Sequence, residues 1–80
     1  MAAQTAKDAY QERRREVAAL LDTIGQELDV HARLMDEEGN RNWGRVGDLG
    51  HVKELLIETL AFVSGRDETD IHDYLEDLKN

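Results

Sequence analysis

The 80-residue chain contains no cysteine, no proline and only four aromatic residues. Without cysteine the chain forms no disulfides and lacks the thiolate ligands of the commonest structural zinc sites. Without proline, no position imposes a break on a helix, and the scarcity of aromatic residues disfavours strands. We therefore expect an all-α protein.

The chain also lacks an apolar run of the roughly 20 residues that a helix needs to cross a bilayer. Its start, MAAQTAKDAYQ, has no apolar segment of the kind found in secretory signals. We expect a cytoplasmic protein with no membrane partner. Eighteen acidic residues against ten basic ones give a net charge of −8, which disfavours direct binding to nucleic acid.

Residue patterns typical of catalysis or metal binding are missing as well. The one serine, Ser64, is expected at a helix end, and His31, His51 and His72 lie on three different predicted helices with no nucleophile spaced to form a triad. The inward-facing Glu-x-x-His pairs of helical two-metal sites do not occur. We expect neither an enzyme nor a bound metal or cofactor.

A seven-residue apolar repeat runs through a predicted first helix, about residues 5–36. Its eight positions, which we call the seam, form two columns: Tyr10, Val17, Ile24 and His31, and Arg14, Leu21, Leu28 and Met35. Six of the eight are apolar, and small residues lie beside them at Ala18, Gly25 and Ala32. A small column lets another helix approach closely. We expect a dimer interface made by Val17, Leu21, Ile24, Gly25, Leu28, His31 and Met35.

His31 is a polar exception within the seam. One interpretation is a core or interface histidine with a hydrogen-bond partner, matched across a dimer axis. The other is a pH-sensitive contact, since histidine is the side chain whose charge changes near neutral pH.

The remaining boundaries follow from glycines and capping residues. Gly39 is expected to end the first helix in a left-handed conformation, and residues 37–47 are predicted to form a connection. Asp48 then caps a second helix, about 49–64, which Gly65 terminates. A third, one-sided helix is predicted at about 68–79.

These helices predict one domain, 1–80, in which the long first helix packs antiparallel against the two shorter ones as a broken helical hairpin. The second helix is apolar almost all round and is expected to be the most buried segment. Neither long helix finds enough surface to pack on within one chain. We therefore expect a homodimer that resembles a four-helix bundle.

The segment 39–53 differs in charge from the rest of the chain, at +2 against −10 for the remainder. Arg41, Arg45 and three glycines near a helix start raise the possibility of an anion site. The alternative is a tight turn in which Trp43 closes the end of the hairpin. If Trp43 is exposed between the two arginines, the three residues become the best candidate for binding an unknown protein partner.

Two classes of function remain. The first is a homodimeric interaction or regulatory module. The second is an acidic, DNA-mimic-type inhibitor of a nucleic-acid-binding protein, because an acidic helix imitates a row of phosphates. Its carboxylates would come from the third helix: Asp67, Glu68, Asp70, Asp73, Glu76 and Asp77.

Overall fold

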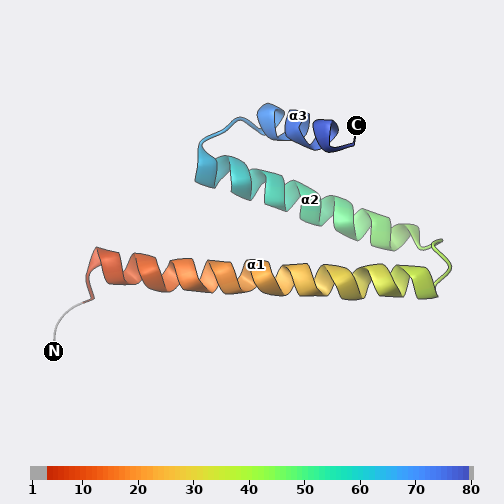
Figure 1. Cartoon of the computed structure of the whole chain (residues 1–80), viewed down its shortest axis with the longest axis horizontal. Helices are drawn as coiled ribbons and strands as arrows, with labels where there is room; N and C mark the ends of the chain where they lie inside the picture. Colours follow the sequence, from red (N-terminus) through yellow and green to blue (C-terminus); the bar gives the residue numbers. More distant parts are fainter. Residues whose placement is uncertain (1–3, 80) are drawn as a thin grey trace. The chain divides into compact units, whose positions relative to one another are not determined.

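The computed structural model describes residues 4–79 and contains three helices and no strands in that range (Figure 1). Helix α1 spans Ala6–Glu37, α2 spans Trp43–Ser64 and α3 spans Glu68–Leu78. The all-α prediction is thus confirmed for the described residues. Contacts divide the chain into two units, residues 1–41 and 42–80, which are described separately below.

Helix α1 has defined caps at both ends. The Thr5 hydroxyl accepts a hydrogen bond from the Asp8 N–H over 3.1 Å, which satisfies one of the free amides at the helix start. At the other end Gly39 adopts a φ of 76°, its N–H donates to the Asp36 carbonyl, and the Asn40 N–H donates to the Met35 carbonyl over 2.9 Å. This pair of bonds is a Schellman motif. Gly39 ends α1 in the left-handed conformation, as predicted.

Helix α2 begins six residues before the predicted start at Leu49. Asn42 is its N-cap, and the Oδ1 atom accepts from the Gly44 N–H at 3.0 Å and the Arg45 N–H at 3.4 Å. Asp48 therefore lies inside the helix, and its assignment as the cap was wrong. The predicted connection 37–47 shrinks to the five residues 38–42. Side-chain capping at Asn42 outweighs the poor helix propensity of the glycines that follow.

The second unit is a pair of helices in contact with each other. Gly65, with a φ of 73°, ends α2 as predicted, and its N–H donates to the Ala61 carbonyl over 2.9 Å. The chain then reverses, so that α3 runs back beside α2 (Figure 1). Ile57 of α2 and Ile71 of α3 are each 4% exposed and are the only buried residues among those described.

Burial is the main departure from expectation. Helix α2 was predicted to be the most buried segment, yet Ile57 is its single buried residue. Helix α1 has none. Most of the apolar side chains of both long helices are therefore exposed or half-buried.

Candidate interaction surface

Large apolar side chains are exposed on each of the three helices. The most exposed are Phe62 at 89%, Trp43 at 80% and Val63 at 77% on α2, while Tyr10 of α1 is 67% and Leu78 of α3 is 64% exposed. Removing apolar side chains from water is the main favourable contribution to association between proteins. These exposed apolar faces are therefore the candidate interaction surface.

The seam of α1 contributes one part of this exposed surface. Because side chains three, four and seven residues apart share a helix face, the seam forms a continuous stripe along α1. Its large apolar members range from half-buried at Met35 to 67% exposed at Tyr10. The stripe carries the residues predicted to form a dimer seam: Val17, Leu21, Ile24, Gly25, Leu28, His31 and Met35. All seven lie on one unbroken helix.

Gly25 lies beside the middle of the seam, and the chain's own packing does not explain it. A Cβ atom built at Gly25 meets nothing within 4 Å. A glycine inside a helix is less favourable than alanine by about 1 kcal/mol. Close approach of a further helix is a physical reason for a residue without a side chain at this position.

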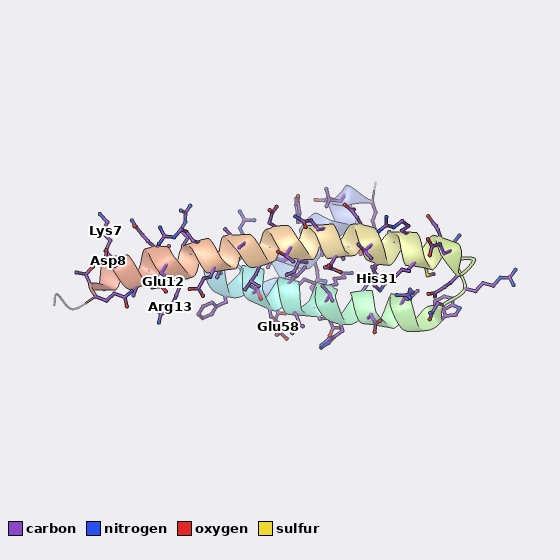
Figure 2. All side chains as sticks on the ribbon, turned by 90° about the horizontal axis from the view of Figure 1, so that it is seen from below. Lys7, Asp8, Glu12, Arg13, His31 and Glu58 are labelled. Carbon is purple, nitrogen blue, oxygen red and sulfur yellow. The ribbon has the colours of Figure 1, made fainter. Side chains whose placement is uncertain are left out.

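His31 is half-buried, and its Nε2 atom is shielded from solvent without a hydrogen-bond partner among the described residues. Figure 2 shows His31 in the second half of α1, and Arg13 among the charged side chains of the first half. A buried polar atom without a partner costs about 1–3 kcal/mol. The predicted hydrogen-bond partner of His31 is therefore not supplied within the described residues.

Helix α2 carries a second apolar stripe, and the buried Ile57 is not part of it. Its members recur at helical spacing and are half-buried or exposed: Leu49, Val52, Leu56, Leu60 and Val63. Phe62 projects on yet another side of α2 and is 89% exposed. Phe62 was not predicted as an interaction residue, although its position seven residues after Leu55 on the polar side of α2 is a detectable signal.

Trp43 lies at the first position of α2 and is 80% exposed, so it does not act as a buried plug. The cap at Asn42 places Trp43 on the open first turn of the helix. Arg41 is exposed and precedes the cap, whereas Arg45 is half-buried in the first turn of α2. Residues two apart on a helix do not face each other, so Trp43 and Arg45 point in different directions.

The anion-site alternative for this segment is weakened by the same cap. A bound phosphate requires free backbone amides at the helix start, but the Gly44 and Arg45 amides already donate to Asn42. Gly44, Gly47 and Gly50 have no positive φ and continue the helix. The expectation that these glycines form a tight turn was wrong, because the glycine conformations needed for one occur at Gly39 and Gly65 instead.

The part of the chain that the structure describes contains no cluster of metal-binding side chains. No group of three or more His, Asp or Glu side chains is gathered there to hold a metal ion. His31 lies on α1, His51 on α2 and His72 on α3. The three histidines therefore lie on three separate helices.

The comparisons with protein-family models, with curated proteins and with solved structures found no match. None of the described helices combines the length and the apolar character needed to span a membrane.

Proposed function

We propose that this chain is a homodimeric helical module for protein–protein interaction or regulation. The observation that carries the proposal is the apolar seam of α1, whose members Tyr10, Val17, Leu21 and Leu28 are 40–67% exposed and which contains no buried residue. A continuous exposed apolar stripe marks a site of protein–protein interaction, because covering it removes apolar surface from water.

The assembly that we propose is a four-helix bundle in which α1 of each copy lies antiparallel to α2. The lengths of the helices support it: 32 residues of α1 extend about 48 Å and 22 residues of α2 about 33 Å. The five-residue connection 38–42 is of the length that joins antiparallel neighbours in bundles. The exposed Trp43, with Arg41 and Arg45, is the surface that we propose for a further protein partner, since Trp and Arg dominate binding energetics.

Light scattering of the purified chain tests the dimer. We expect a mass of about 18 kDa, twice the 9.1 kDa of the chain, over micromolar concentrations. The variant Leu28→Glu places a charge in the seam and should shift the mass toward the monomer. Gln26→Glu adds the same charge on the opposite face of α1 and should leave the dimer intact. A wild-type mass near 9 kDa at all these concentrations would refute the proposal.

A DNA-mimic-type inhibitor is the second candidate, favoured by the acidic surface of α3. Asp70, Asp73 and Asp77 share one face at i, i+3 and i+7, and all three are exposed. Glu68 and Asp70 in the first turn also stabilise the helix start through its dipole. The remaining carboxylates, Asp67 and Glu76, are exposed too, although Glu76 pairs with Lys79 at 3.1 Å.

The two candidates differ in their response to salt. A partner held by the α3 carboxylates should be lost between low and moderate ionic strength, because exposed charges are screened. A partner held by Trp43 should stay bound. Pull-downs from source cells, with Trp43→Ala beside Asp70→Asn/Asp73→Asn/Asp77→Asn, separate the two, since each variant removes one surface only.

A further inference from the structure

The charges of α1 are distributed unequally between its two halves. Residues 6–21 contain four basic and three acidic side chains, whereas residues 22–37 contain one basic and five acidic side chains. Lys7 and Arg13 lie in the first half of the helix (Figure 2). Two α1 helices side by side in parallel would place the two acidic halves together, whereas an antiparallel pair places each acidic half, at −4, against a half at +1. Charge complementarity therefore favours the antiparallel pair.

The seam specifies one antiparallel register. In an antiparallel pair the two columns of the seam face each other, so each layer joins one residue from each column. With the pair centred between residues 22 and 23, the apolar layers are Val17 with Leu28 of the second copy, Ile24 with Leu21, and Tyr10 with Met35. Each large apolar residue of the seam then meets another, and no apolar member is left opposite a charge.

The same register brings the two polar exceptions together. Arg14 of one copy lies opposite His31 of the other, and the symmetry repeats the pair on the far side of the axis. A guanidinium donates hydrogen bonds, and a neutral imidazole accepts one at the nitrogen without a proton. Arg14 and His31 are therefore compatible as a polar layer within the seam. A parallel pair would instead set Arg14 against its own copy, which repels.

Small residues also match in this arrangement. In an antiparallel pair, the small column beside the seam of one copy faces the same column of the other copy. Ala18 of each copy therefore lies near Gly25 of the other, which gives two equivalent contacts. The space around Gly25, where an added Cβ meets nothing, is then used by the second helix. Small residues at such a contact permit a short distance between helix axes.

From this register, and on the basis of the proposed homodimer, we propose that the seam of α1 is covered by the seam of a second copy, antiparallel and centred between residues 22 and 23. The occupant is a second copy because each apolar member of the exposed seam meets another apolar member and because the two halves of α1 complement each other in charge.

Disulfide trapping tests this register, and the absence of native cysteine makes every introduced thiol unambiguous. Val17→Cys and Leu28→Cys chains, one carrying a size tag, are unfolded together, refolded and oxidised. Mixed dimers, linked from position 17 of one chain to position 28 of the other, should form. Neither variant should cross-link with itself, since identical positions are 11 residues, or about 16 Å, apart along the axis in this register.

Ala19→Cys with Gln26→Cys is the matched control, because the two positions have the same axial register on the opposite face of α1. This pair should stay unlinked, and circular dichroism checks that all four variants are helical. Self-linked dimers of the Val17→Cys or the Leu28→Cys chain, or linkage of the control pair only, would overturn the register. A light-scattering dimer without a 17–28 link would overturn the seam as the shared face while leaving the homodimer standing, whereas a monomeric wild type would overturn both.

Discussion

The Oδ1 atom of Asn42 accepts a hydrogen bond from the backbone N–H of Gly44 over 3.0 Å, and this contact begins α2. Replacing a side-chain N-cap by alanine usually costs about 1 kcal/mol. Asn42→Ala should therefore lower the free energy of unfolding by about that amount and reduce helicity in α2. Asn42→Asp keeps the acceptor and should change stability little. Urea denaturation followed by circular dichroism measures both, and equal stability of all three proteins would contradict the cap.

The contact between α2 and α3 depends on Ile57 and Ile71, each 4% exposed. Truncation of a buried Ile to Ala costs about 2–5 kcal/mol. Ile57→Ala and Ile71→Ala should each destabilise the second unit by an amount in this range, and hydrogen exchange should show loss of protection in α3. Phe62→Ala is the control, because its ring is 89% exposed and its loss should cost less than about 0.5 kcal/mol. A cost at Phe62 equal to that at Ile57 would show that a partner covers this ring.

Substitution by alanine should change stability in opposite directions at Gly65 and Gly47, although both glycines have the same free space around them. A Cβ meets nothing within 4 Å at either Gly65 or Gly47, so the backbone conformation decides. Gly65 has a φ of 73°, where a side chain costs about 1–2 kcal/mol. Gly47 is helical, where alanine is favoured by about 1 kcal/mol. Thermal unfolding should show a lower Tm for Gly65→Ala and a higher Tm for Gly47→Ala, and a rise for both would contradict the left-handed end of α2.

Trp43 should behave as a solvent-exposed indole, since it is 80% exposed. We expect an emission maximum close to that of free tryptophan and efficient quenching by acrylamide. Trp43→Phe/Phe62→Trp supplies a reference indole at another exposed position of the same helix. A blue-shifted, protected Trp43 beside an unshifted reference would rule out this ring as a free partner-binding surface.

Arg14 and His31 should be energetically coupled between copies if the antiparallel register holds. We expect the double variant Arg14→Leu/His31→Leu to differ from the sum of its single variants by about 0.5–3 kcal/mol in dimer stability. Concentration-dependent urea unfolding measures this cycle. The control cycle combines Arg14→Leu with Gln26→Leu, on the opposite face, and should be additive to within about 0.5 kcal/mol. Additivity in both cycles would argue against the Arg14–His31 pair.

Local signals predicted helix ends well where a glycine decides them. The first and third helices, expected at about 5–36 and 68–79, are found at Ala6–Glu37 and Glu68–Leu78. The start of α2 was misjudged because three glycines within seven residues are typical of a loop. The asparagine before them was a capping signal as well, and its two hydrogen bonds prevail.

The candidate surface was partly predictable. The heptad columns identify the seam of α1 because a helix converts sequence spacing into a face. The exposure of Trp43 was not predictable, since an indole is equally compatible with a core and with an interface. Phe62 was missed although its neighbours on that side of α2 are polar, and its ring is 89% exposed.

The sequence by itself determined the all-α class, the long amphipathic first helix and the glycine ends at Gly39 and Gly65. These features depend on hydrogen bonds and spacings within a few residues along the chain. Only the tertiary structure decided that, among the described residues, Ile57 and Ile71 alone are buried and that Trp43 and Phe62 are open. Burial depends on which faces meet, and a helix that is apolar nearly all round does not itself specify which face a neighbour will cover.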